Sequence, residues 1–351
     1  MKLELDLAFL ERLLGAIGPT GFEDEAARVW CAQAETFADR VERDAHGNAY
    51  AQINPGGTPR LMLAGHIDEI GVIVTHIDDD GYVYFQGLGG WDPQVLVGQR
   101  LRFLGPQGSV LGVVGRKPIH LLEAAEREKA VKIDELWADI GAKDGAEARA
   151  HLEVGAVGVI AQPLERLLGR RVASKAIDNR IGAFAVLEAL RYLKAAGVAA
   201  EVTAVATVQE EIGAYGARTA AYRLRPDTAL VVDVTFCSRQ PGVDKKKWGE
   251  APLGSGANLA VGPFVHPKVL RRLRELAERE KVPYTLAAHW RFSGTDADEI
   301  ALVREGVPSA VVSIPNRYMH SPSEVVDLGD VEAVVRLLAL YAQAPVTDLV
   351  R

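Results

Sequence analysis

The sequence predicts an α/β fold, in which a small β-rich segment interrupts a layered domain. After Pro163 helix-like and strand-like segments alternate, while short strand-like runs separated by turns occupy the middle of the chain. Hydrophobic residues make up 48% of the 351 positions, which is enough for a large core. We therefore expect a three-layer domain with a mainly parallel mixed sheet, formed by residues 1–67 and 163–351, and an inserted β-rich domain at 68–162.

The first part of the chain contains helical and then strand-like patterns. Helical periodicity runs over residues 7–40 and is interrupted by a turn at 18–25. Residues 60–74 predict a buried strand, a polar turn and a second apolar strand. In the insert we expect strands within 81–86, 99–105 and 109–116, and a helix within 120–131.

The second part of the chain predicts the alternation that defines the layered domain. Residues 177–197 form an amphipathic helix pattern that ends at Gly197. Further strands are predicted within 200–211, 225–236 and 308–315, and further helices within 266–282 and 330–344.

Charge and composition exclude several classes of function. The formal net charge of −7 argues against nucleic acid as the main partner. No run of 18 apolar residues is present, and the N-terminus does not resemble a signal peptide, so we expect no membrane partner. Cys31 and Cys237 match neither a disulfide framework nor a thiolate metal site, which favours a reducing, cytoplasmic setting.

Polar residues follow the predicted strands of the layered domain at the points where each strand ends. Ligands of open α/β sheets bind beyond the carboxyl ends of the strands. The residues found at such ends, or where a helix begins, are His66, Asp68, Asp178, Glu210, Glu211, Asp233 and His320.

Together these residues favour a metal site. Imidazole and carboxylate without thiolate suit zinc, cobalt or manganese in a catalytic site. The candidates outnumber the three protein ligands of a typical catalytic metal, which suggests two ions that share a bridging carboxylate. One of the two adjacent glutamates would then bind metal while its neighbour stays free as general base, and Asp68 would fix the imidazole of His66.

Each residue also has a structural interpretation. His66 alone could be a structural histidine, Asp178 a helix cap and Asp233 a turn residue, while Glu210 and Glu211 could be surface charges. These alternatives are individually common, but their joint occurrence at strand ends favours one shared site.

Several motifs resemble the M42 metallo-aminopeptidases, the group of tetrahedral, glutamyl and deblocking aminopeptidases. The motifs "AGHIDEIG", "KAIDNRIG", "VQEEIG", "VVDVT", "SGTDAD" and "MHSPSEVV" occur in the order found in that family, and "GGWDPQVLVGQRL" in the insert is similar to it as well. Two motifs depart from the commonest pattern, with "IDNR" where "DDR" is frequent and "SGTDA" where "GGTDA" is. Asp178 is intact, so neither change threatens metal binding.

The resemblance implies a role for each residue of the predicted site. Asp178 would bridge two divalent ions, zinc or cobalt with manganese also suitable. Glu211 and His320 would complete the ligand set of one ion, and His66 and Asp233 that of the other. Glu210 would be the general base and Asp68 would orient His66. The residues implied to contact substrate are Ser293, Thr295 and Asp296.

The resemblance also implies an activity and an assembly. The chain would release N-terminal residues from short peptides. The insert would be a PDZ-like dimerisation domain, and the dimers would assemble into hollow tetrahedral dodecamers. Three other functions remain open from the residues: a metal-dependent N-acyl amino acid deacylase, a sugar hydrolase and a non-catalytic assembly protein.

The preferred N-terminal residue is open at this stage. Lys245 to Lys247 and Arg291 could line a pocket for acidic side chains. Phe236, Phe292 and Tyr318 could equally form an apolar pocket.

Overall fold

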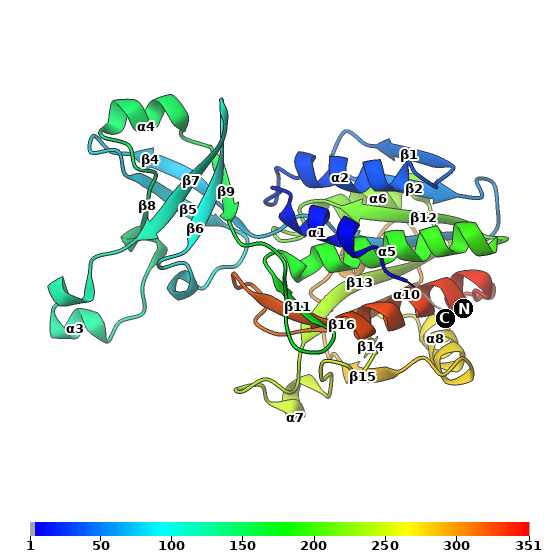
Figure 1. Cartoon of the computed structure of the whole chain (residues 1–351). Helices are drawn as coiled ribbons and strands as arrows, with labels where there is room; N and C mark the ends of the chain where they lie inside the picture. Colours follow the sequence, from blue (N-terminus) through cyan, green and yellow to red (C-terminus); the bar gives the residue numbers. More distant parts are fainter. Residues whose placement is uncertain (1–3, 351) are drawn as a thin grey trace.

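A computed structural model describes residues 4–350 and shows a layered domain beside a smaller barrel (Figure 1). The layered domain has one large hydrophobic core, which draws on the N-terminal segment and on most of the chain after residue 171. The barrel has a separate core, formed between Val72 and Ile160.

The large sheet is mixed and mainly parallel, as the sequence predicts. Neighbouring strands pair in parallel between β12 and β3, β3 and β13, β13 and β16, and β14 and β15, and the other three pairings are antiparallel. In spatial order the strands are β1 (Arg40–Arg43), β2 (Ala49–Ile53), β12 (Glu201–Thr207), β3 (Arg60–His66), β13 (Thr228–Phe236), β16 (Ser309–Asn316), β14 (Ala257–Val261) and β15 (Tyr284–Ala288).

Helices cover this sheet. The longest, α5 (Ile177–Ala196), packs against β3, β12 and β13 and against α10 (Leu328–Gln343). Figure 1 shows α5 and α10 running alongside the strands. The remaining helices of this domain are α1 (Leu7–Gly15), α2 (Asp24–Ala34), α6 (Tyr215–Leu224), α7 (Lys245–Trp248), α8 (Pro267–Arg279) and α9 (Ala297–Ile300).

A pair of glycines allows the first turns of α5 to lie directly on β3. A Cβ atom at Gly65 would lie 2.5 Å from the backbone carbon of Gly182, and a Cβ at Gly182 would lie 2.3 Å from Asn179 Oδ1. At Gly65 no larger side chain fits without a shift of backbone, whereas at Gly182 the Asn179 side chain would have to move. The close approach brings the end of β3, with His66, next to the start of α5, with Asp178.

The insert is a closed barrel with the strand order β4-β5-β8-β7-β6-β9, which confirms the predicted β-rich barrel. Its core holds Phe85, Leu101 and Phe103. The strands are β4 (Gly71–Ile77), β5 (Val83–Leu88), β6 (Arg100–Gly105), β7 (Gly108–Gly115), β8 (Trp137–Asp139) and β9 (Val157–Ile160), and α4 (Gly145–His151) lies beside them. A small sheet follows the barrel, with β10 (Glu165–Arg166), β11 (Arg171–Ser174) and β17 (Glu324–Asp327).

Two local predictions are wrong. The helix predicted within 120–131 is mostly irregular, with a single 3-10 turn at Ile119–Leu121 and one helical turn, α3 (Ala124–Arg127). Leu121 is exposed and no residue of α3 is buried, so this segment has no packed face to stabilise a longer helix. The helical periodicity predicted as far as residue 40 stops at Ala34, and β1 and β2 follow.

Within residues 4–350, no helix combines the length and the apolar character that crossing a bilayer requires.

Candidate metal centre

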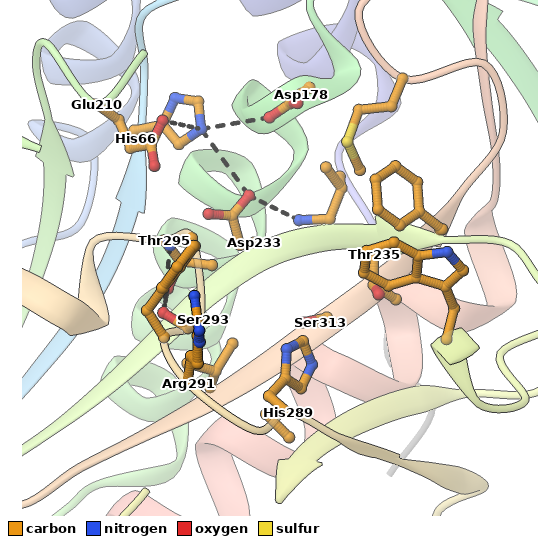
Figure 2. A pocket seen from close by; sticks show the side chains of 18 of the residues that line it. His66, Asp178, Glu210, Asp233, Thr235, His289, Arg291, Ser293, Thr295 and Ser313 are labelled. Atoms are coloured by element: carbon orange, nitrogen blue, oxygen red, sulfur yellow. Dashed lines mark hydrogen bonds and ion pairs between the residues drawn. The ribbon is translucent and has the colours of Figure 1, made fainter. Parts of the chain in front are cut away.

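The residues predicted at strand ends converge at one edge of the large sheet. His66 ends β3, Asp233 lies in β13, and Asp178 lies in the first turn of α5. Glu210 and Glu211 follow β12, and His320 lies between β16 and β17. Figure 2 shows His66, Asp178, Glu210 and Asp233 pointing toward one another at one end of a cavity.

Ligand atoms of this cluster form two groups that share one residue. The first group is His66, Asp178 and Asp233, and the second is Asp178, Glu211 and His320. Within each group the ligand atoms all lie within 4.8 Å of one another. Glu210 belongs to neither group, although it lines the same cavity.

Asp178 directs one carboxylate oxygen to each group. Its Oδ1 lies 3.3 Å from Nε2 of His66, and its Oδ2 lies 3.2 Å from Nε2 of His320. Asp233 Oδ1 is 3.8 Å from His66 Nε2, and Glu211 Oε1 is 3.2 Å from His320 Nε2. Two ligand atoms of one tetrahedral zinc ion, each about 2.0–2.2 Å from the metal, are about 3.3–3.6 Å apart. These separations therefore leave room for one cation in each group.

The charge of the cluster favours divalent cations. Across residues 4–350, the ion pairs of Asp178, Glu210, Glu211 and Asp233 involve the two histidines and no lysine or arginine. Four largely buried carboxylates beside two imidazoles leave an excess of negative charge in a region of low dielectric. The donor set, imidazole nitrogen and carboxylate oxygen without thiolate, fits zinc and similar ions.

Burial, together with the neighbouring charges, perturbs the pKa values of the cluster. Burial raises the pKa of Glu210 to about 10, and Asp233 adds to the shift while His66 opposes it. Burial also raises the pKa of Asp233 well above its usual range, against the effect of His66. For His320, burial acts to lower the pKa, but Asp178 and Glu211 outweigh it and raise the pKa to about 11. The bare cluster thus retains protons, and cations that displaced them would supply the same missing positive charge.

Asp68 holds both glutamates through their backbone. Its Oδ1 accepts a hydrogen bond from the Glu210 amide at 3.2 Å, and its Oδ2 accepts one from the Glu211 amide at 3.1 Å. His66 Nδ1 lies 3.5 Å from Asp68 Oδ1, which is longer than an ordinary hydrogen bond. The fully buried Asp68 therefore acts more on the Glu210–Glu211 turn than on the His66 ring.

Three residues that support this cluster were missed by reasoning from the sequence. Glu324, which is buried, accepts hydrogen bonds from the amides of Asp178 at 2.7 Å and His320 at 2.9 Å. Gly90, from the barrel, approaches His320 Nδ1 with its carbonyl oxygen at 2.8 Å. Glu69 forms ion pairs at 2.8 Å with both Lys175 and Arg180. All three lie inside quoted motifs: Glu69 in "AGHIDEIG", Gly90 in "GGWDPQVLVGQRL" and Glu324 in "MHSPSEVV".

The Glu69 network ties together the two segments that carry His66 and Asp178. Arg180 is fully buried and donates hydrogen bonds to the carbonyls of Ile67, Ala16 and Gly18. Because Glu69 follows β3 and Arg180 lies in α5, these contacts fix the end of one element against the start of the other.

The residues predicted to contact substrate differ in their positions. Ser293 and Thr295 line the cavity beside the cluster, and Figure 2 shows them on one of its walls. Asp296 is not among the lining residues, and its side chain is 1% exposed. It points inward and forms a hydrogen bond with Thr207 of β12. Direct contact between Asp296 and substrate is therefore not supported by this geometry.

Overlapping groups of histidine and carboxylate at the strand ends of a mixed α/β sheet are typical of one class of protein, the hydrolases that use divalent metal ions. A family model described as M42 glutamyl aminopeptidase matches residues 47–337, and the chain belongs to this family of metallopeptidases. The resemblance drawn from the motifs is thereby confirmed.

Individual relatives agree with this assignment. The chain is 36% identical to the lysyl aminopeptidase of Pyrococcus furiosus over 95% of both chains. It is similar in structure to the TET aminopeptidase of a marine sediment Thaumarchaeota archaeon, with a TM-score of 0.92, 34% identity, and coverage of 97% of this chain and 96% of that one. A further similar structure is the Pyrococcus horikoshii TET1 peptidase, which can assemble into a tetrahedron or a large octahedral shell. Its TM-score is 0.85 and its identity is 25%, over 96% and 99% of the two chains.

Proposed function

We propose that the chain is an aminopeptidase with two divalent ions at this centre, zinc or cobalt, with manganese also suitable. His66 and Asp233 would hold one ion, Glu211 and His320 the other, and Asp178 would bridge them. The observation that supports this most directly is the position of Asp178, whose two oxygens face different ligand groups.

Divalent ions bound at such a centre lower the pKa of a coordinated water toward ~7 and polarise the carbonyl of the bond to be cleaved. Glu210 would act as general base in this reaction. Its carboxylate lines the cavity, belongs to neither ligand group, and has Oε2 3.8 Å from His66 Nε2. A free carboxylate beside the ligands can take a proton from the attacking water and deliver it to the leaving amine.

Two buried carboxylates would position these groups. Asp68 holds the backbone of Glu210 and Glu211, so the base and a ligand keep a fixed spacing. Glu324 does the same for Asp178 and His320. Ser293 and Thr295 would contact substrate from the cavity wall.

Substrates would be short peptides with a free N-terminus. One ion or an acidic side chain of the centre would receive the free α-amino group, which would restrict cleavage to the N-terminal residue. An N-acyl amino acid lacks that free amino group, and neither the family model nor the named relatives favour a deacylase.

Removal and restoration of metal tests this function. The protein is stripped with a chelator, and hydrolysis of leucyl-p-nitroanilide and N-acetyl-leucyl-p-nitroanilide is measured after zinc, cobalt or manganese is added back. We expect the stripped protein to be inactive and the reconstituted protein to cleave only the substrate with the free amine. Full activity without metal, or faster cleavage of the acetylated substrate, would exclude the proposal.

We also propose that residues 68–162 form a dimerisation domain and that the dimers assemble into a tetrahedral dodecamer in the cytoplasm. The tetrahedral assembly of the P. horikoshii relative supports the dodecamer, and two free cysteines suit a reducing compartment. Light scattering coupled to size-exclusion chromatography measures the mass directly. A particle of twelve chains is expected, and a monomer would contradict the assembly.

A further inference from the structure

The cavity of about 560 Å³ extends from the metal centre over one face of the large sheet. We propose that this extension receives the N-terminal side chain of the substrate and selects large apolar residues over lysine and glutamate. The inference rests on the proposed aminopeptidase function and concerns the same site.

Small side chains, two of them hydroxyl-bearing (Thr235 and Ser313), form the floor of this extension. Asp233 pairs in register with Ser313, and residues two apart along a strand face the same side of a sheet. Thr235 and Val311 therefore lie on the face that carries Asp233, and Ala260 of the neighbouring β14 lines the cavity with them. The floor is thus continuous with the metal centre and has no long side chain to fill it.

A row of aromatic rings borders the cavity. The ring centroids of Phe236 and Trp248 are 5.0 Å apart, and those of Trp248 and Trp290 are 6.3 Å apart. These rings come from the end of β13, from α7 and from the segment after β15. Phe236 is 42% exposed, Trp248 38% and Trp290 63%. Large aromatic surfaces that are left exposed beside a cavity are typical of ligand-binding sites.

The charges around the extension disfavour a lysine side chain. Outside the metal centre, no aspartate or glutamate is among the described residues that line the cavity. The one permanently charged cation there is Arg291, and the structure shows no ion pair for it among residues 4–350. His289 lies on the same side, and burial lowers its pKa below the usual value, which favours the neutral ring. A lysine ammonium group would enter this region beside a like charge, with no carboxylate on the described lining outside the metal centre.

Arg291 does not make the extension a pocket for acidic residues. Its side chain is exposed to solvent, where an ion pair with a carboxylate contributes little. Burial of a large apolar side chain against the aromatic row contributes more. The three lysines that the sequence suggested as an acid-binding group do not line the cavity. Lys245 pairs with Glu250, and Lys247 lies over the Trp248 ring.

Kinetics of the metal-loaded protein on a panel of aminoacyl-p-nitroanilides test this inference. We expect kcat/KM for leucine and phenylalanine to exceed that for lysine and for glutamate by about tenfold or more. Trp290→Ala should lower kcat/KM for the phenylalanyl substrate more than for the alanyl substrate, because the methyl group of the alanyl substrate does not reach the aromatic row.

The reversal of charge at position 291 tests the argument about lysine. Arg291→Glu should raise the ratio of kcat/KM for lysine to that for leucine by roughly two- to fivefold, since it removes a like charge and supplies a solvent-exposed counter-charge. The matched control is Arg274→Glu, the same change at an exposed position of α8, and it should leave this ratio unchanged.

The possible failures are distinct. A metal-loaded protein that cleaves lysyl or glutamyl substrates as well as leucyl ones would overturn the inference and leave the aminopeptidase function intact. A lysine-to-leucine ratio that does not respond to Arg291→Glu would remove the charge argument. Failure to cleave any free aminoacyl substrate would overturn the proposed function, and the inference with it.

Discussion

At the scale of single residues, the notable feature is the division of the centre between two adjacent glutamates. Glu211 lies in a ligand group with His320, whereas Glu210 faces the same cavity from outside both groups. Asp68 accepts a hydrogen bond from the backbone amide of each, so the turn after β12 holds both residues beside the cavity. Adjacent acids can therefore serve as ligand and base without competing for one position.

Glu324 supplies a prediction at this scale. Its Oε2 accepts a hydrogen bond from the backbone amide of Asp178, and its Oε1 accepts one from the backbone amide of His320. In Glu324→Gln the side-chain NH₂ would face one of those amides, and both are donors. We expect metal affinity to fall by roughly 10–100-fold, measured by competition with a chromogenic chelator.

The control for that variant is Glu332→Gln, because Glu332 forms an ion pair with Arg170 on the surface, away from the centre. Its metal affinity should equal that of the parent protein. Unchanged affinity in Glu324→Gln would show that the backbone around Asp178 and His320 is held by other contacts.

At the scale of elements, the centre depends on how closely α5 approaches β3. Gly65 lets the two backbones meet, and the ion pairs of Glu69 with Lys175 and Arg180 also hold the two elements together. The buried acid of this network is fully paired, which avoids the cost of an unpaired buried charge.

Gly65→Ala tests this close packing. The added Cβ would lie 2.5 Å from the Gly182 carbon, so β3 and α5 must separate. We expect the free energy of unfolding to fall by about 1–3 kcal/mol, measured by urea denaturation of the metal-free protein. Gly15→Ala is the control, since nothing lies within 4 Å of a Cβ at that position, and its stability should be unchanged or slightly higher.

Sequence patterns predicted those elements that bury a continuous apolar face. The helix at 177–197 and the strands that carry His66 and Asp233 are of this kind, because the spacing of their apolar residues along the sequence indicates which side is buried. The loop around α3 was predicted as a longer helix, since its composition favours helix but no neighbouring element packs on it. Strand β1 is half exposed at the sheet edge and carries little apolar signal.

The candidate site likewise has features that the sequence predicts and features that it does not. Its convergence could be predicted, because the carboxyl ends of neighbouring strands share one edge of the sheet. The contacts of Glu324 with Asp178 and of Gly90 with His320 could not be predicted, because each joins residues far apart along the chain. Asp296 was expected at the substrate, but the chain turns its side chain inward toward Thr207.

At the scale of the whole molecule, the barrel contributes a contact to the metal centre. The Gly90 carbonyl lies 2.8 Å from His320 Nδ1, so it favours a proton on that nitrogen and leaves Nε2 free toward Asp178 and Glu211. The inserted domain therefore helps to orient a residue that we propose as a metal ligand in the other domain.

Gly90→Ala tests this contact between domains. A Cβ there would lie 3.2 Å from His320 Nδ1, so the ring must move by a few tenths of an ångström. We expect metal affinity to fall by about tenfold, measured by isothermal titration calorimetry with zinc. Lys129→Ala, at an exposed position of the same insert, should bind zinc as the parent does. Equal affinities in both variants would show that the barrel does not position His320.

The central claim is that Glu210 acts as base and is not a ligand, and Glu210→Gln tests it most directly. Metal content per chain and kcat on leucyl-p-nitroanilide are measured on the same preparation. We predict two ions per chain, as in the parent protein, and a fall in kcat of about 10²–10⁴-fold. Near-normal turnover, or the loss of one bound ion, would contradict the assignment.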